Sequence, residues 1–462
     1  DLYAGETKHF AASSVSRIVV ADAQDGNDVL TVGEGIAADL EFHGGAGNDK
    51  VTYLGTGKAL VYGDAGDDRI TVASTAHGSG YDSQIYGGDG KDTLSGGAGN
   101  DFFSGGDGND KIKGGAGDDV IYGGDESVAI TGDKANGDIV DGGDGNDTIY
   151  GGTRADAIKG GKGSDIIYGG DESGVLSSGK ALGDTIDGGK DNDTIYAGAG
   201  GDVVKGGDGD DVIHGGDGDD TIIAGNGIDQ VWGDGKHSAA DATARTGNDT
   251  IYWTVGEGLD SVIDGGTGND GIVVTGADVN TTIALSNNGP NIDLAWGATT
   301  LTLAGVEKYN LNAGTGVDIF TINDVSANGV KEVSISLGGA VTEITQYDYN
   351  KDGTYNDTPP QMADGEGVLL FDSLGNPVYA DVYADGTPVP YKVLKQFTSD
   401  ASADSVTIYG GAGSDTFSAA TAVTSDGSWV LNMSRQNPVG GATLTTYSVG
   451  QTGLANDQLT LY

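Results

Sequence analysis

The chain has 462 residues, of which 86 are glycine, 7 are proline and none is cysteine. Its 70 acidic and 23 basic residues give a formal net charge of −47, so binding to the phosphates of nucleic acid or to anionic lipid is unfavourable. Without cysteine, disulfides, thiolate metal sites and cysteine nucleophiles are excluded. No apolar run reaches the roughly 18 residues of a membrane helix. We therefore expect no nucleic acid partner, no membrane insertion, and stability from packing or from hard metal ions.

The first part of the chain, residues 1–86, contains glycine- and aspartate-rich turns at uneven spacing. Aspartates stand at the ends of these turns at Asp28, Asp49 and Asp68. We predict that residues 1–86 form irregular β-coils that lead into a regular repeat region over residues 87–275.

A nine-residue repeat dominates that region. From Gly87 the chain reads GGDGKDTLS, GGAGNDFFS, GGDGNDKIK and GGAGDDVIY without a gap. Ordinary hairpin turns also use Asp-Gly and Asn-Gly, but they do not require a constant period with the glycines, the aspartate and the aliphatic residue all in register. The pattern GGxGxD begins at Gly44, Gly87, Gly96, Gly105, Gly114, Gly142, Gly160, Gly206, Gly215, Gly265 and Gly410.

This unit resembles the RTX, or hemolysin-type, calcium-binding nonapeptide repeat GGxGxDxUx of secreted bacterial proteins, in which U is a large aliphatic residue. The resemblance implies an all-β fold, a right-handed parallel β-roll with two nonapeptides in each 18-residue coil. In such a roll GGxGxD forms the calcium-binding turn and the next three residues form a short strand. We expect this roll to continue into an irregular β-helix or β-sandwich region.

Two ten-residue insertions interrupt the period, near residues 125–136 and 171–182. If both loop out, the aspartates keep an 18-residue step and form two columns, one on each edge of the roll. The first column contains Asp92, Asp110, Asp138, Asp156, Asp184, Asp202 and Asp220. The second column contains Asp101, Asp119, Asp147, Asp165, Asp193, Asp211 and Asp229.

These columns are the candidate metal sites, because calcium takes six to eight oxygen ligands and glycine-rich turns expose backbone carbonyls. By resemblance, each ion lies between successive turns, held by an aspartate from each turn and by carbonyls. The carbonyls expected to contribute include those of Gly97, Gly99, Gly115, Gly117, Gly207, Gly209, Gly216 and Gly218. Less regular turns extend the series at Asp28, Asp49, Asp68, Asp249, Asp260 and Asp270. The regular columns predict about 12 calcium ions, and all turns together about 20.

The aliphatic residue two places after each aspartate is expected to point inward, so its neighbours point outward. One outer column then contains Ser104, Tyr122, Tyr150, Tyr168, Tyr196, His214 and Trp232, and the other contains Ser95, Lys113, Asp141, Lys159, Asp187, Lys205 and Ile223. Two interpretations are open. The columns either stabilise the sheets alone, or the aromatic one binds a partner, which is a surface glycan or another copy of the chain.

Residues 276–462 are predicted to form a β-rich region with repeat-like turns at 313–321 and 410–418, which contain Asp318 and Asp415, and an insertion near 331–400. Within the insertion, Asp348, Asn350 and Asp352 match the opening of a DxDxDG calcium loop. Pro359 stands where such a loop carries its last acidic ligand, so an acidic solvated turn is the alternative.

The sequence contains no HExxH, GxSxG or phosphate-binding GxxxxGK[ST] motif, and we assign no catalytic residue and no enzymatic activity. The pattern and the resemblance predict a calcium-binding, calcium-folded structural module of a secreted or cell-surface bacterial protein, such as a surface layer, an extracellular fibre or matrix, or an adhesin. The alternative is an RTX folding and export module of a larger secreted enzyme or toxin.

Removal of calcium is expected to unfold the repeat region, because stacked carboxylates repel one another and glycine favours the unfolded chain. Far-ultraviolet circular dichroism should show a largely disordered chain in a strong chelator and β-structure when calcium is restored. A spectrum that the chelator leaves unchanged would refute this expectation.

Overall fold

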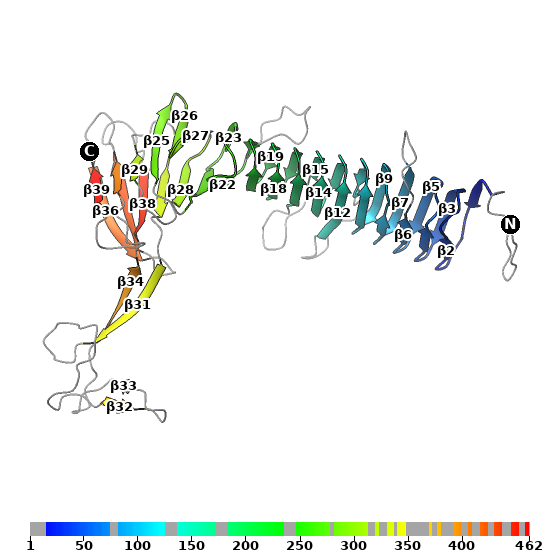
Figure 1. Cartoon of the computed structure of the whole chain (residues 1–462), viewed down its shortest axis with the longest axis horizontal. Helices are drawn as coiled ribbons and strands as arrows, with labels where there is room; N and C mark the ends of the chain where they lie inside the picture. The colour runs from blue at the N-terminus through cyan, green and yellow to red at the C-terminus, as the bar shows by residue number, and fades with distance from the viewer. Residues whose placement is uncertain are drawn as a thin grey trace. The chain divides into compact units, whose positions relative to one another are not determined.

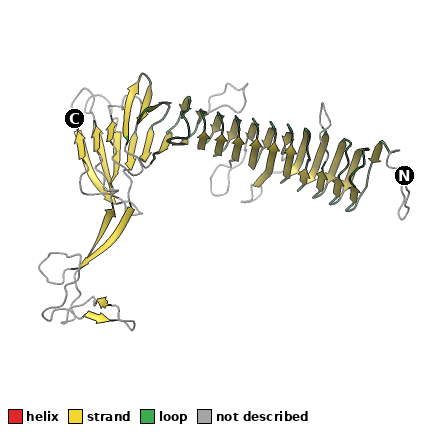
Figure 2. Cartoon of the chain, in the orientation of Figure 1, coloured by secondary structure: helices red, strands yellow, loops and turns green. Residues whose placement is uncertain are grey.

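The computed structural model describes residues 15–73, 82–124, 136–171, 183–234, 246–277, 281–312, 319–322 and 330–336, and only strands beyond residue 336. All regular secondary structure in these residues is β-strand (Figure 2). None of them forms a helix that is long and apolar enough to cross a membrane. The chain divides into two units, described separately below. The first contains residues 1–276, 283–311 and 322–333, and the second contains residues 277–282, 312–321 and 334–462.

Most of the first unit is a parallel β-roll in which successive strands alternate between two sheets (Figure 1). The odd-numbered sheet contains β1 (Arg17–Val20), β3 (Asp39–Ala46), β5 (Ala59–Ala65), β7 (Ser83–Gly90), β9 (Asp101–Gly108), β11 (Val120–Tyr122), β13 (Thr148–Gly152), β15 (Ile166–Asp171), β17 (Thr194–Ala199), β19 (Val212–Asp217), β21 (Gln230–Trp232) and β23 (Val262–Asp264). The even-numbered sheet contains β2 (Val29–Val32), β4 (Lys50–Tyr53), β6 (Arg69–Val72), β8 (Thr93–Ser95), β10 (Lys111–Ala116), β12 (Asn136–Asp144), β14 (Ala155–Lys162), β16 (Thr185–Lys190), β18 (Val203–Asp208), β20 (Thr221–Asn226), β22 (Thr250–Thr254) and β24 (Gly271–Thr275).

The predicted register is confirmed, including across both insertions. Ile195 pairs with Ile213 in the regular region, 18 residues apart. Ile112 pairs with Val140 and Ile158 with Ile186, each 28 residues apart, which is one coil plus ten residues. Residues 125–135 and 172–182, where most of the two insertions fall, lie outside the described residues.

The core is a double row of inward-pointing side chains between the two sheets. All aliphatic or aromatic residues that follow the regular aspartates by two places are at most 3% exposed: Leu94, Phe103, Ile112, Ile121, Val140, Ile149, Ile158, Ile167, Ile186, Ile195, Val204, Ile213, Ile222 and Val231. Burying such a side chain contributes roughly 1.5–3 kcal/mol. Because each coil supplies only two of them, the core is thin and the turns must also contribute to the stability of the roll.

The glycines of the turns allow each turn to lie directly on the one before it. Gly106 and Gly108 have φ values of 110° and 147°, a region that other residues rarely adopt. A Cβ atom on Gly108 would lie 1.5 Å from the carbonyl oxygen of Gly90 in the preceding turn. The GGxGxD pattern is therefore required by backbone conformation and by the close stacking of turns.

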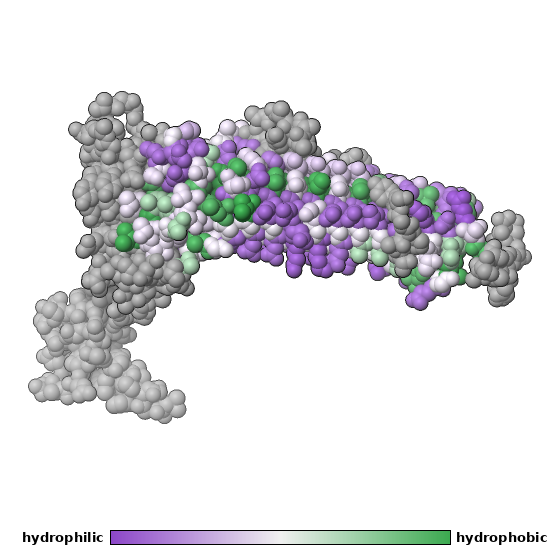
Figure 3. Space-filling view, turned by 45° about the horizontal axis from the view of Figure 1, so that its top comes forward, coloured by the Kyte–Doolittle hydropathy of each residue, from purple (hydrophilic) through white to green (hydrophobic). Residues whose placement is uncertain are grey.

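The two outer faces of the roll differ, although both come from the same repeat. On the odd-numbered sheet, rings on successive strands contact one another at centroid distances of 4.5–5.7 Å, and all are stacked except Phe102, which is tilted by 45–46° against both neighbours. We call this row the aromatic ladder, and it consists of His43, Tyr62, Tyr86, Phe102, Tyr122, Tyr150, Tyr168, Tyr196, His214 and Trp232. On the even-numbered sheet Lys113, Asp141, Lys159, Asp187 and Lys205 follow one another in register. Figure 3 shows a hydrophilic band along the roll with hydrophobic residues in separate patches.

After β24 the parallel coil gives way to an antiparallel meander of β25 (Thr282–Asn288), β26 (Asn291–Trp296) and β27 (Thr299–Ala304), and β27 also pairs in parallel with β23. Gly289 and Gly297 supply the positive φ values, 63° and 61°, that tight hairpin turns need. Three further strands follow in the chain: β28 (Lys308–Asn312), β29 (Ile319–Ile322) and β30 (Glu332–Ser336).

Beyond residue 336 the second unit is described only by its strands. Antiparallel pairs join β31 (Ala340–Tyr347) to β34 (Tyr391–Thr398), β32 (Leu369–Phe371) to β33 (Pro377–Tyr379), and β37 (Trp429–Gln436) to both β36 (Thr416–Val423) and β38 (Thr445–Gln451). A parallel pair joins β35 (Ser405–Ile408) to β39 (Gln458–Leu461). The division of the chain at residues 86 and 275 stays a prediction.

Replacing Gly108 by alanine is expected to destabilise the calcium-bound roll, by about 1–3 kcal/mol for the strained backbone alone. The melting temperature in calcium should fall by several degrees. The control is Gly33→Ala, where an added Cβ meets nothing within 4 Å and should leave the melting temperature nearly unchanged. Equal effects of the two substitutions would contradict the stacked-turn explanation.

Candidate metal centre

The aspartates of the first column are joined by hydrogen bonds from turn to turn. The backbone N–H of each donates to Oδ1 of the next, as from Asp92 to Asp110 at 2.8 Å. The same contact recurs at 2.6–2.9 Å through Asp28, Asp49, Asp68, Asp92, Asp110, Asp138, Asp156, Asp184, Asp202, Asp220, Asp249 and Asp270. The less regular turns at both ends therefore continue the column of the regular repeat.

The second column has the same geometry on the opposite edge. Its hydrogen bonds measure 2.7–2.8 Å from Asp101 to Asp229 and 3.3 Å from Asp229 to Asp260. The members are Asp101, Asp119, Asp147, Asp165, Asp193, Asp211, Asp229 and Asp260. Asp82 is also buried, but it lies beside the column rather than in it, because Ser83 pairs with Asp101 and Asp82 N–H donates to the carbonyl oxygen of Asn100 at 2.6 Å. Sequence reasoning missed this buried aspartate, because no GGxG segment precedes it.

These carboxylates are buried, and one oxygen of most of them lacks a hydrogen-bond donor. Apart from the half-buried Asp28, the column members are at most 7% exposed. Oδ1 accepts the N–H of the neighbouring turn, whereas Oδ2 has no donor within the described residues in Asp28, Asp49, Asp68, Asp92, Asp110, Asp119, Asp147, Asp156, Asp165, Asp193, Asp202, Asp211, Asp220, Asp249 and Asp270. A buried carboxylate oxygen of this kind requires a cation or a proton.

Carbonyl oxygens of the adjoining turn converge on the same places. The Cβ position of Gly87 would lie 2.3 Å from Asp92 Oδ2 and 2.4 Å from the carbonyl oxygen of Gly105, one coil further on. Among the described residues no group of three His, Asp or Glu side chains converges on one point. A metal ion here would therefore draw its other ligands from the backbone, as a glycine-rich turn allows.

A second ladder, which the sequence reasoning missed, runs beside each column. The residue before the aspartate accepts the N–H of its counterpart in the following turn, as when Asp118 N–H donates to Asn100 Oδ1 at 3.1 Å. Asn146 N–H in turn donates to Asp118 Oδ1 at 2.9 Å. The sequence does contain a pattern that predicts this ladder, since Asn or Asp stands directly before the turn aspartate in most repeats.

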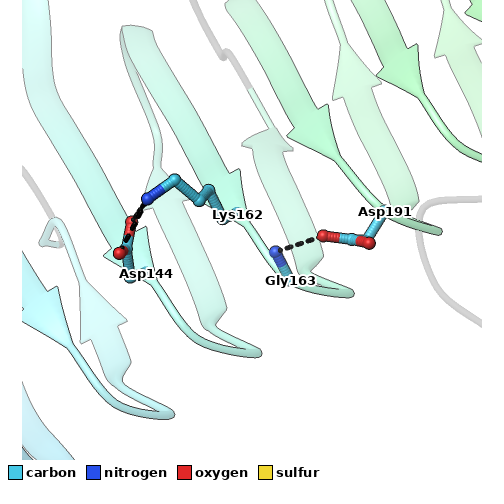
Figure 4. A network of polar contacts seen from close by, with 4 residues as sticks. All are labelled: Asp144, Lys162, Gly163 and Asp191. Atoms are coloured by element: carbon cyan, nitrogen blue, oxygen red, sulfur yellow. Dashed lines mark hydrogen bonds and ion pairs between the residues drawn. The ribbon is translucent and has the colours of Figure 1, made fainter.

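Exposed side chains also link the turns (Figure 4). Lys162 Nζ donates to both carboxylate oxygens of Asp144 at 2.7 and 2.8 Å, and Gly163 N–H donates to Asp191 Oδ2 at 3.2 Å. Asp191 replaces the third glycine of GGxGxD and keeps its positive φ, at 70°. Solvent-exposed pairs such as Asp144 and Lys162 contribute little to stability, so the buried columns dominate.

The first column ends at Asp270, where other groups replace the next turn. Asp270 N–H donates to Glu307 Oε2 at 2.8 Å, so a glutamate takes the position of an aspartate. Two ammonium groups also reach this turn: Lys308 Nζ donates to the carbonyl oxygen of Asn269 at 3.2 Å, and Lys331 Nζ donates to Asn269 Oδ1 at 3.0 Å. The two lysines therefore bring positive charge to the end of the first column.

A comparison with protein families agrees with this geometry. The family model for the RTX calcium-binding nonapeptide repeat (4 copies) matches residues 73–103, 96–127, 138–176, 178–213, 196–231 and 398–421. The chain carries RTX calcium-binding repeats. The matched segments between 73 and 231 coincide with the regular coils of the roll. No curated protein matches the chain significantly.

RTX repeats bind calcium, and the buried Oδ2 atoms and turn carbonyls are the hard oxygen ligands that this ion prefers. The predicted carbonyls lie at the turns: Gly97 O accepts the N–H of Ala116 at 3.0 Å, and Gly99 O faces Gly117. The role of each residue as a calcium ligand stays a prediction. Asp318, Asp348, Asn350, Asp352 and Asp415 lie outside the described residues.

Burial is the main cause of large pKa shifts in the metal-free columns. It raises the pKa of Asp110 to about 7, of Asp119 to about 8 and of Asp220 to about 9, and neighbouring carboxylates raise each value further. Hydrogen bonds from the backbone N–H groups oppose the shift but do not outweigh burial. Near neutral pH the columns must therefore hold either protons or metal ions.

Replacing Asp92 by asparagine should weaken calcium binding, because it removes a carboxylate charge from the column and keeps an oxygen acceptor for the N–H of Asp68. The calcium concentration at the folding midpoint should rise roughly twofold or more. Asp89→Asn, at an exposed position of the same turn, is the matched control and should shift the midpoint little. An equal shift for both variants would mean that only net charge matters.

Without metal, the roll should become more stable as the pH falls from 8 to 5. The folded pKa values of about 6 to 9 exceed the unfolded value of 3.8, so folding takes up protons in this range and its stability is lost as the pH rises through the folded pKa values. Circular dichroism in a chelator, with light scattering to exclude aggregation, measures this. Greater β-content at pH 8 than at pH 5 would contradict the assignment of the raised pKa values.

Proposed function

We propose that this protein is a calcium-folded structural module of a secreted or cell-surface bacterial protein, of the surface-layer, extracellular fibre or adhesin kind. The observation that carries the proposal is the pair of aspartate columns, one from Asp28 to Asp270 and the other from Asp101 to Asp260. In most of these turns the second carboxylate oxygen needs a cation. A fold built in this way depends on its metal at every coil.

The number of gaps between aspartates sets the number of ions. Twelve aspartates in the first column leave eleven gaps, and eight in the second leave seven, within the described residues. We assign one calcium ion to each gap, about 18 in all, which neutralises most of the formal charge of −47. The acidity of the chain then needs no charged macromolecular partner.

An extracellular location follows from this requirement. Bacterial cytosol is poor in free calcium, so the chain would remain unfolded there and fold after export, where millimolar calcium is available. We assign no catalytic role to the aspartates, because calcium binding accounts for their burial and pairing without a substrate or a nucleophile. The structural role also suits a rigid roll whose length is set by the number of repeats.

Stepwise addition of calcium to the chelated chain, followed by electron microscopy and particle sizing, tests this proposal. We expect folding at millimolar calcium and ordered sheets or filaments. Magnesium, which is smaller and keeps its waters, should not replace calcium. Folded single particles at every calcium concentration would refute self-assembly and favour an export module of a larger enzyme or toxin.

A further inference from the structure

On one outer face of the roll, the two positions beside each core residue carry no charged side chain over nine strands, and Asp64 on β5 occupies the position that Gly88 has on β7. On β5 to β21 of the odd-numbered sheet, the residues on either side of each core residue point outward, and none is Asp, Glu, Lys or Arg. On the even-numbered sheet the corresponding positions include Lys113, Asp141, Lys159, Asp187 and Lys205. In a chain with a net charge of −47, an uncharged strip of this length marks an interaction surface.

The aromatic ladder on this face is poorly suited to stack against sugar rings. Tyr122, Tyr150, Tyr168 and Tyr196 lie nearly parallel, with interplanar angles of 4–6° and centroid distances of 4.6–5.2 Å. Their faces are covered by one another, and Tyr122, Tyr150 and Tyr168 present their edges and hydroxyl groups outward, whereas Tyr196 is only 7% exposed. A partner must therefore fit a ridge of ring edges rather than a single flat ring.

A groove runs beside this ridge. It has a volume of about 710 Å³, and its floor consists of glycines such as Gly152, Gly170 and Gly198, which present backbone without side chains. Ridge and groove both repeat once per strand, at about 4.8 Å. A second copy of the chain has the same repeat distance and the same ridge and groove, so the match extends over successive turns.

The size of the face is sufficient for a stable contact. Nine strands span about 40 Å, and about six residues across the ridge and groove span about 20 Å. The resulting area of about 800 Å² equals the area that each partner contributes to a standard protein–protein interface. Shape, area and lack of charge all fit the same occupant.

We propose that the outer face of β5 to β21 binds the same face of a second copy, with the aromatic ladder of each copy packed over the glycine groove of the other. This pairing rests on the proposed function, because two copies that each carry a charge of −47 repel one another until calcium neutralises the columns. It identifies the lateral contact of the assembly and requires no charged residue from either copy.

The test places a lysine on one face or the other of the full chain. Thr194→Lys puts a charge on β17 in the proposed interface, and Thr185→Lys puts it on β16 in the even-numbered sheet. Sedimentation in saturating calcium measures mass, and circular dichroism measures folding. We expect the parent chain and Thr185→Lys to pair, and the dissociation constant of Thr194→Lys to rise about tenfold or more. Thr148→Lys, on β13 of the same face, should repeat that effect.

The outcomes separate the two proposals. If all variants fold and assemble like the parent chain, or if the parent folds but stays single, the pairing face is wrong while calcium folding stands. If the parent chain folds but does not pair, the face is covered by another partner or by the chain's own residues 125–135 and 172–182. If Thr185→Lys alone abolishes pairing, the opposite face is the interface. If calcium does not fold the parent chain, the proposed function and the pairing fall together.

Discussion

The structure depends on carboxylates that are buried in successive turns, in one column along each edge of the roll. Each aspartate satisfies the backbone N–H of the neighbouring turn with one oxygen and leaves the other without a donor in most turns. Hydrogen bonding alone therefore holds the turns in register but leaves a buried negative charge. Since the core supplies only two apolar side chains per coil, it cannot offset that charge at every turn. A cation between the turns resolves the conflict, and the metal thereby becomes part of the folding free energy.

Most of the roll could be predicted from the sequence because its constraints are local and repeated. Only glycine fits where Gly108 faces the carbonyl oxygen of Gly90, and a one-residue slip would turn every core residue outward. The ten-residue insertions did not hide the register, since Asp110 and Asp138 keep the same contact across 28 residues. The assignment of the aspartates to two edges followed from the same step.

The features that escaped prediction lack this repetition. Asp82 is buried beside one column and Glu307 ends the other, and neither follows a GGxG turn, so only the three-dimensional structure places them there. Lys308 and Lys331 reach Asn269 from outside the repeat region. The antiparallel meander of β25 to β27 begins where the glycine-rich turns cease, and hairpin turns at Gly289 and Gly297 replace them. Non-local contacts of this kind carry no periodic signal.

The repeat also separates stability from recognition. Inward residues and turns are restricted by packing and metal binding, whereas the outward positions can vary from coil to coil without disturbing the columns. The two sheets use this freedom differently, with alternating charges on one face and stacked rings on the other. A calcium-dependent fold can in this way present a long surface of uniform spacing, and the ions that stabilise it also reduce the repulsion between copies.

The most direct test of the account is the number of calcium ions bound by the folded chain, measured by equilibrium dialysis with elemental analysis while circular dichroism monitors folding. One ion per gap predicts about 18 ions that bind over the same calcium range in which the β-structure forms. A roll that is fully folded at neutral pH with only one or two ions bound would contradict the claim that the metal neutralises the buried columns.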